Sequence, residues 1–129
     1  MSIIIRKAEL NDIETLSNML NELFSIEDDF IPDSVKQKKG LELIISGIDG
    51  GGIFIAQYGT RVAGMMNLQK IVSTAAGGFS VLLEDLYVEP DMRRRGIGSM
   101  LINHAVGWSK EEQAVRIQLG ADARNAPAL

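Results

Sequence analysis

The sequence of 129 residues contains no cysteine and a single histidine, His104. The lack of cysteine excludes a disulfide framework and a thiolate metal site, and it fits a reducing cytoplasm. One histidine gives almost no support to a histidine-based catalytic triad or zinc site. We therefore expect a cytoplasmic protein that holds no metal, with His104 as a packed side chain of its helix.

Long apolar runs and an excess of positive charge are also missing. No apolar run approaches the length of a membrane span, and the N-terminus lacks a signal-peptide pattern. The net charge is −4, so the basic surface of a nucleic-acid-binding domain is absent and cationic substrates are mildly favoured by steering. With 46% apolar and 23% charged residues, one globular domain is predicted over residues 1–129, with neither a membrane nor a nucleic acid as partner.

The most informative stretch is 80–101, SVLLEDLYVEPDMRRRGIGSML. Residues 81–88 are apolar on both faces apart from Glu84 and Asp85, which predicts an interior strand covered on each side. Strand alternation is expected to place these two acids on opposite faces. Carboxylates are costly in such a strand unless a site uses them, so this strand is a candidate part of an active site.

An anion site is predicted directly after this strand. Gly96 and Gly98 adopt backbone angles closed to other residues and let a ligand approach the main chain. A helix is expected from Ser99 onward, so unpaired N–H groups lie at its start, where anions bind. Three neighbouring arginines add positive charge that suits a diphosphate, although an ordinary strand–turn–helix connection would have the same pattern. These arginines are Arg93, Arg94 and Arg95.

The pattern Arg93-x-x-Gly96-x-Gly98 after the string LEDLYVEP resembles the acyl-CoA-binding signature of the GNAT family of N-acetyltransferases. Within that family, LEDLYVEPDMRRRGIGS is most similar to the spermidine/spermine and other small-amine acetyltransferases. The resemblance implies an α/β (α+β) fold in which a mostly antiparallel central sheet is flanked by helices. It also implies acetyl-CoA as a co-substrate.

The remaining segments predict the other elements of such a fold. Strands are expected at 3–6, 53–56, 61–72 (with Gly64 at a bulge) and 114–119, and helices at 13–24, at 35–46 and directly after Gly98. Because a helix connects 81–88 with 114–119, these two strands should pair in parallel.

Residues 120–129 resemble the start of the family's last helix, which in relatives carries a general-acid tyrosine and precedes two more strands. The sequence stops before that position, so we expect a C-terminally truncated domain that lacks the last strands. Tyr58 and Tyr87 do not match the acid's position, and no general acid is assigned. The strand edge left open at 114–119 predicts a homodimer.

The resemblance also implies the binding residues. The main chain around Leu86, Tyr87 and Val88 would pair with the pantetheine arm, and an asparagine at position 125, Asn125, would contact the same arm. Glu27 and Asp28 lie between the first two helices, where the family has its acceptor pocket, although a cluster of acids in such a loop is usually part of a solvated surface. The loop and helix start that would hold the diphosphate comprise Arg93, Arg94, Arg95, Gly96, Ile97, Gly98 and Ser99.

Glu84 is the candidate catalytic residue. It matches the acid of the family's LED string, where the acid binds the amine and assists its deprotonation. A carboxylate in an apolar groove has a raised pKa, which suits a base at neutral pH. A structural ion pair is the alternative role for Glu84, while Asp85 is expected to bind structure on the opposite face.

The function implied is transfer of an acetyl group from acetyl-CoA to the primary amine of a small cationic substrate by direct attack on the thioester. The alternative is a non-catalytic acyl-CoA-binding sensor or subunit that uses the same loop. A P-loop phosphotransferase is a weaker rival, because no Gly-Lys-Ser/Thr follows the glycines.

Overall fold

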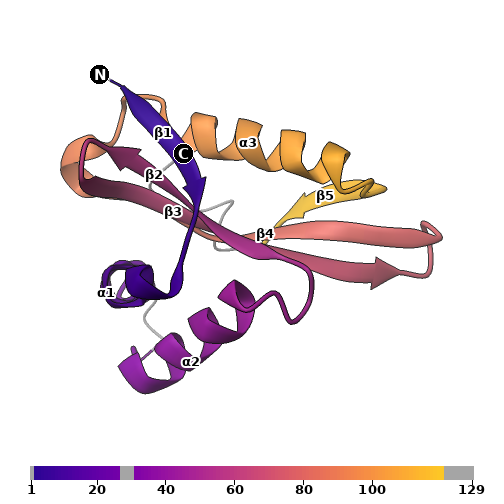
Figure 1. Ribbon diagram of the computed structural model, residues 1–129, viewed down its shortest axis with the longest axis horizontal. Helices are drawn as coiled ribbons and strands as arrows, with labels where there is room; N and C mark the ends of the chain where they lie inside the picture. Colours follow the sequence, from indigo (N-terminus) through magenta and orange to yellow (C-terminus); the bar gives the residue numbers. More distant parts are fainter. Residues whose placement is uncertain (1, 27–30, 121–129) are drawn as a thin grey trace.

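One five-stranded sheet forms the centre of the computed structural model, which describes residues 2–26 and 31–120 (Figure 1). The strand order is β1-β2-β3-β4-β5, and every neighbouring pair is antiparallel except β4 and β5. The strands are β1 (Ile3–Lys7), β2 (Gly52–Tyr58), β3 (Arg61–Ser73), β4 (Gly78–Val88) and β5 (Arg116–Leu119). The mostly antiparallel sheet and the parallel pairing of its last two strands are both as predicted.

Helices cover both faces of this sheet. In Figure 1, α1 (Ile13–Phe24) and α2 (Ser34–Ile45) lie on one face, and α3 (Ile97–Glu111) lies on the other. The side chain of Asp33 caps α2 by accepting hydrogen bonds from the backbone N–H groups of Val35 and Lys36, at 3.1 and 3.2 Å. Short 3-10 turns, η1 (Leu10–Asp12) and η2 (Pro90–Met92), precede α1 and α3.

β4 contributes to the hydrophobic core on both sides of the sheet. Leu86 and Val88 pack beneath α3, whereas Tyr87 packs with Leu16 and Leu20 of α1. All of these side chains are at most 4% exposed, and full burial of each such aliphatic or aromatic side chain stabilises the fold by roughly 1.5–3 kcal/mol. The predicted interior character of this strand is confirmed.

The start of β4 and the position of the bulge in β3 differ from the sequence prediction for local reasons. β4 begins at Gly78 rather than at position 81, because β3 and β4 stay paired down to Ser73 and Gly78. The bulge expected at Gly64 lies one residue earlier, since Ala56 pairs with Gly64 and Gln57 with Val62, which leaves Ala63 as the extra residue.

None of the helices within residues 2–26 and 31–120 combines the length and the apolar character required to cross a membrane.

Candidate active site

A bulge in β4 brings both acids of the LED string to one face of the sheet. Met65 pairs with Tyr87 and Asn67 with Glu84, so two residues of β4, Asp85 and Leu86, stand opposite one residue of β3. Asp85 has a φ of +53°, in the left-handed region that aspartate tolerates better than most residues. The extra residue interrupts the strict alternation of side chains.

The prediction that Asp85 lies on the opposite face of the sheet from Glu84 is therefore wrong. Leu83 and Leu86 both pack in the core beneath α3. Alternation from Leu83 therefore places Glu84 on the α1/α2 face, and Asp85 lines a pocket on that same face together with Asn67. The bulge accommodates two successive side chains on one side of the strand, which a regular strand cannot do.

This pocket has a volume of about 160 Å³ and lies between α1, α2 and the bulge. Apolar side chains form most of its wall: Leu20, Phe24, Leu41 and Ile44. Four polar side chains complete it: Lys36, Gln37, Asn67 and Asp85. A second hollow of about 340 Å³ adjoins it and shares Lys36 and Gln37.

Hydrogen bonds hold the polar side chains of this pocket in place. The amide of Asn67 donates to a carboxylate oxygen of Asp85 at 3.1 Å, and Asn67 in turn accepts from Gln69 at 3.3 Å. The buried amide of Gln37 donates to Asn21 of α1 at 2.9 Å and accepts from the backbone N–H of Asp33 at 2.9 Å. Gln37 therefore ties α1 to the start of α2 where both border the pocket.

The pairing between β4 and β5 ends just before the bulge. Their parallel pairing covers only 80–83 of β4, and its last hydrogen bond runs from the backbone N–H of Gly120 to the carbonyl of Leu83 at 2.8 Å. From Glu84 to Val88, β4 pairs with β3 alone among the described strands. The backbone of Leu86, Tyr87 and Val88, predicted to bind the pantetheine arm, thus lies along the side of β4 that β5 leaves uncovered.

The start of α3 has the geometry of an anion site. Gly96 adopts a φ of +81° as the N-cap, and the first helical hydrogen bond runs from the N–H of Met100 to the carbonyl of Gly96. The N–H groups of Ile97, Gly98 and Ser99 therefore lie in the first turn, where a helix offers them no backbone acceptor. The helix begins at Ile97, two residues before the predicted start, because Gly96 provides the left-handed cap.

The three arginines before α3 take different positions. Arg93 donates from Nε to the carbonyl of Val88 at 2.9 Å, and its guanidinium lies 5.4 Å from the centre of the Tyr87 ring. Arg93 thereby anchors the loop to β4, whereas Arg94 and Arg95 are exposed next to the helix start. Burial raises the pKa of Tyr87, with a smaller contribution from Glu89, so this phenol stays protonated at neutral pH.

Comparison with known proteins identifies the family. The model of the acetyltransferase (GNAT) family matches residues 14–129. The chain belongs to the GNAT family. A possible acetyltransferase from Clostridium difficile 630 has the same fold, with a TM-score of 0.83, 21% identity, and 97% of this chain and 83% of that chain covered.

Two further structures share this fold. A predicted acetyltransferase with acetyl-CoA from Clostridium acetobutylicum has a TM-score of 0.77 and 20% identity over 93% of this chain and 81% of its own. A transcriptional regulator from Bacillus halodurans C-125 has a TM-score of 0.81 and 23% identity over 96% and 85%. The predicted family and fold are thus confirmed, and the GNAT family uses acetyl-CoA.

Not all predicted site residues fall within the described part of the chain. Glu84 and the 86–88 backbone lie at the β4 bulge, and the helix start follows the end of β4, whereas Glu27, Asp28 and Asn125 lie outside residues 2–26 and 31–120. No group of three acidic, histidine or cysteine side chains that could hold a metal occurs within those ranges. His104 packs on Phe54, with ring centres 4.9 Å apart, and is part of the α3 side of the core.

Sequence reasoning missed Lys36, Gln37 and Asn67 as pocket residues. Asn67 had a usable signal, since it is a polar residue within the otherwise apolar string VAGMMNL. Lys36 and Gln37 had none, because such side chains are common on exposed helix surfaces.

Proposed function

We propose that this GNAT protein transfers the acetyl group of acetyl-CoA to the primary amine of a small molecule that is cationic at its reacting end. The observation that carries the proposal is the β4 bulge. It brings Glu84 and Asp85 to the α1/α2 face of the sheet, beside the point where β5 leaves β4. The acids can bind an ammonium group next to the strand edge where a thioester would lie.

The residues present suit the co-substrate. The first-turn N–H groups of α3, with the exposed Arg94 and Arg95, match the negative charge of a diphosphate. The side of 86–88 that pairs with no described strand offers main-chain groups to the amides of a pantetheine arm. When bound, acetyl-CoA supplies the activated acyl carbon.

Acidic side chains of the protein then act on the amine. Glu84 accepts a proton from the ammonium group, which frees the nitrogen lone pair for attack on the thioester carbon. A C–N bond forms and the C–S bond breaks. The nitrogen loses its second proton, and the CoA sulfur takes up one proton, so that one proton is released overall. Tyr87 is 2% exposed and Tyr58 lies at the end of β2, so neither is assigned to protonate the sulfur.

Thiol release from acetyl-CoA, measured against a panel of amines, tests the proposal. We expect amine-dependent release, with an N-acetylated product detected by mass spectrometry. Tight binding of acetyl-CoA without turnover of any amine would instead support the acyl-CoA sensor. Failure to bind acetyl-CoA would refute both functions.

A further inference from the structure

We propose that the acceptor is an amine whose far end is a carboxylate, separated from the amine by a short apolar spacer, and that Lys36 binds this carboxylate. The inference rests on the proposed function and narrows its substrate class. It follows from the distribution of charge in the 160 Å³ pocket on the α1/α2 face.

The pocket has one acidic and one basic lining residue, on different elements. Asp85 comes from the β4 bulge and Lys36 from the first turn of α2, and the wall between them is mostly apolar. A ligand that fits this arrangement has a cationic end, an apolar body and an anionic end. A polyamine would instead bring a second cation to Lys36, and the two like charges would repel each other.

Lys36 is an exposed lysine that lines the pocket. The ion pairs found among the described residues do not include Lys36, whereas Lys38, on the same helix, binds Glu14 at 2.8 Å. Lys36 borders both the pocket and the adjoining hollow, so it stands where the two meet. A ligand can therefore place its amine end and spacer in the pocket while its carboxylate stays at Lys36.

The acidic end of the pocket is positioned for the reacting amine. Asn67 holds the Asp85 carboxylate through its amide, and Asn67 pairs in register with Glu84. The amine end therefore belongs at the bulge, and the opposite end of the ligand points toward α2. The volume is below the roughly 300–1,000 Å³ of pockets for drug-sized ligands, so the spacer is short. Gly40 adds room on the α2 side, since a Cβ there would meet nothing within 4 Å.

Three probe amines of equal carbon number test the charge preference directly. They are δ-aminovalerate, with an anionic far end, pentylamine, with a neutral one, and cadaverine, with a cationic one. In the thiol-release assay we expect the KM to rise in that order, by about tenfold or more from the first to the last, as for loss of a charged hydrogen bond. The KM for δ-aminovalerate should also rise with ionic strength, because Lys36 is exposed.

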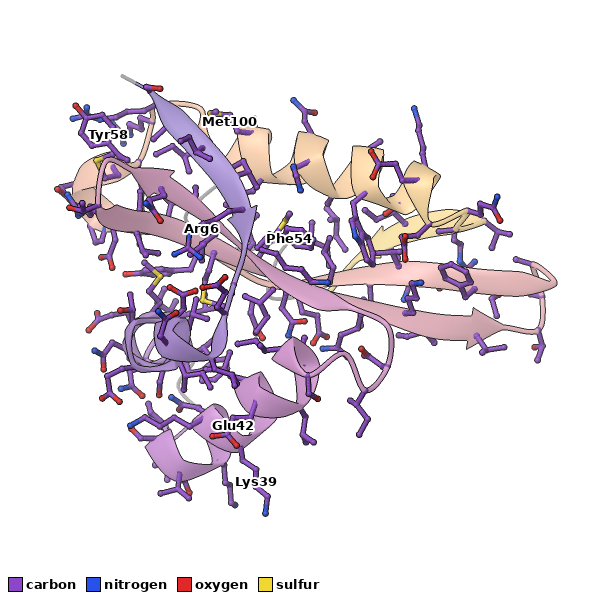
Figure 2. All side chains as sticks on the ribbon, in the orientation of Figure 1. Arg6, Lys39, Glu42, Phe54, Tyr58 and Met100 are labelled. Carbon is purple, nitrogen blue, oxygen red and sulfur yellow. The ribbon has the colours of Figure 1, made fainter. Side chains whose placement is uncertain are left out.

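Two substitutions test whether Lys36 causes the preference for an anionic far end. Lys36→Met should raise the ratio of the KM for δ-aminovalerate to the KM for pentylamine about tenfold, and Lys36→Glu should favour cadaverine. Lys39→Met is the matched control, because Lys39 is on the same helix, does not line the pocket, and points away from the sheet in Figure 2. The control should keep the parent's order of KM values.

The outcomes separate this inference from the proposed function. Acetylation with cadaverine preferred, or a Lys36→Met variant that keeps the parent preference, would overturn the inference while the acetyltransferase function stands. Should no amine be acetylated, saturation-transfer NMR with the same probes still tests the pocket without turnover. Equal or stronger binding of cadaverine in that experiment would again overturn the inference.

Discussion

Asp85 determines which groups β4 presents to the pocket. Its left-handed backbone, φ +53°, belongs to the bulge that turns two successive acids toward α1 and α2. A non-glycine residue in this region costs conformational energy, on the order of 1–3 kcal/mol. The surrounding pairs, Met65 with Tyr87 and Asn67 with Glu84, hold the strand on both sides of it.

Glu84→Gln tests the role of the neighbouring acid. If Glu84 is the base, kcat should fall on the order of 10²-fold and the acidic limb of the pH–rate profile should weaken. If it only binds the amine, the KM for the amine should rise with little change in kcat. Steady-state kinetics and calorimetry of CoA binding, which should not change, distinguish the two roles.

Glu42→Gln is the control for this experiment, since Glu42 is exposed on α2 and does not line the pocket. A folded Glu84→Gln variant with the parent's kcat and KM would show that Glu84 has only a structural role.

Asp12 links stability to pH. It accepts hydrogen bonds from both terminal guanidinium nitrogens of Arg6, at 2.9 and 3.0 Å, and from the N–H of Glu9 at 2.7 Å (Figure 2 shows Arg6 on β1). The Arg6 hydrogen bonds hold the pKa of Asp12 below its usual range, against the opposing effect of burial. Because the folded pKa is the lower one, this stabilisation is present above the unfolded carboxyl pKa of about 3.9 and is lost as pH falls through the folded value.

Asp12→Asn should therefore lower the free energy of unfolding by about 1–2 kcal/mol at neutral pH, and by less in acid. Urea denaturation at several pH values measures the difference. Asp91→Asn, which breaks the exposed pair with Arg61, should change stability little at any pH. An effect of Asp12→Asn that did not shrink in acid would contradict the linkage to Arg6.

At the scale of elements, a substitution at the start of α3 should separate an effect on ligand binding from an effect on helix stability. Ser99 is exposed in the first turn, where a negative side chain interacts favourably with the helix dipole. Ser99→Glu should therefore keep or raise the melting temperature. It should nevertheless weaken CoA binding by about tenfold or more, because it repels the diphosphate.

Calorimetry with CoA and thermal melts of the same samples test this pair of effects, with Ser99→Gln as the uncharged control of similar size. Unchanged CoA affinity in a folded Ser99→Glu variant would remove the diphosphate from this helix start.

The order of elements along the chain was predictable because its causes are local. The apolar runs of β1 to β4, the glycines before α3 and the periodic apolar residues of α1 are visible in the sequence. The parallel pairing of β4 and β5 follows from the intervening helix. The bulge at Asp85 was not predictable in this way, since it depends on how β3 is paired opposite it.

At the scale of the whole molecule, the sheet formed by residues 2–26 and 31–120 has β1 and β5 as its edge strands. β5 is four residues long and pairs with β4 alone among the described strands. Unpaired strand edges recruit further strands, so we predict self-association through this edge into a homodimer. Light scattering from dilute to concentrated solution measures it, and a monomer throughout that range would contradict the prediction.

The sequence by itself determined the family, the fold class and the glycine-capped start of α3, which is the candidate anion site. These depend on short segments, LEDLYVEP and RRRGIG, whose proline, glycines and arginines act through local backbone geometry and charge. Only the tertiary structure decided which side chains share the 160 Å³ pocket on the α1/α2 face. Lys36, Asn67 and Asp85 come from α2, β3 and β4, and meet because a bulge and a helix packed on the sheet place them there. Side-chain alternation alone would have put the two acids on opposite faces. A bulge adds one residue to the strand and interrupts this alternation, and its position depends on the pairing with the neighbouring strand.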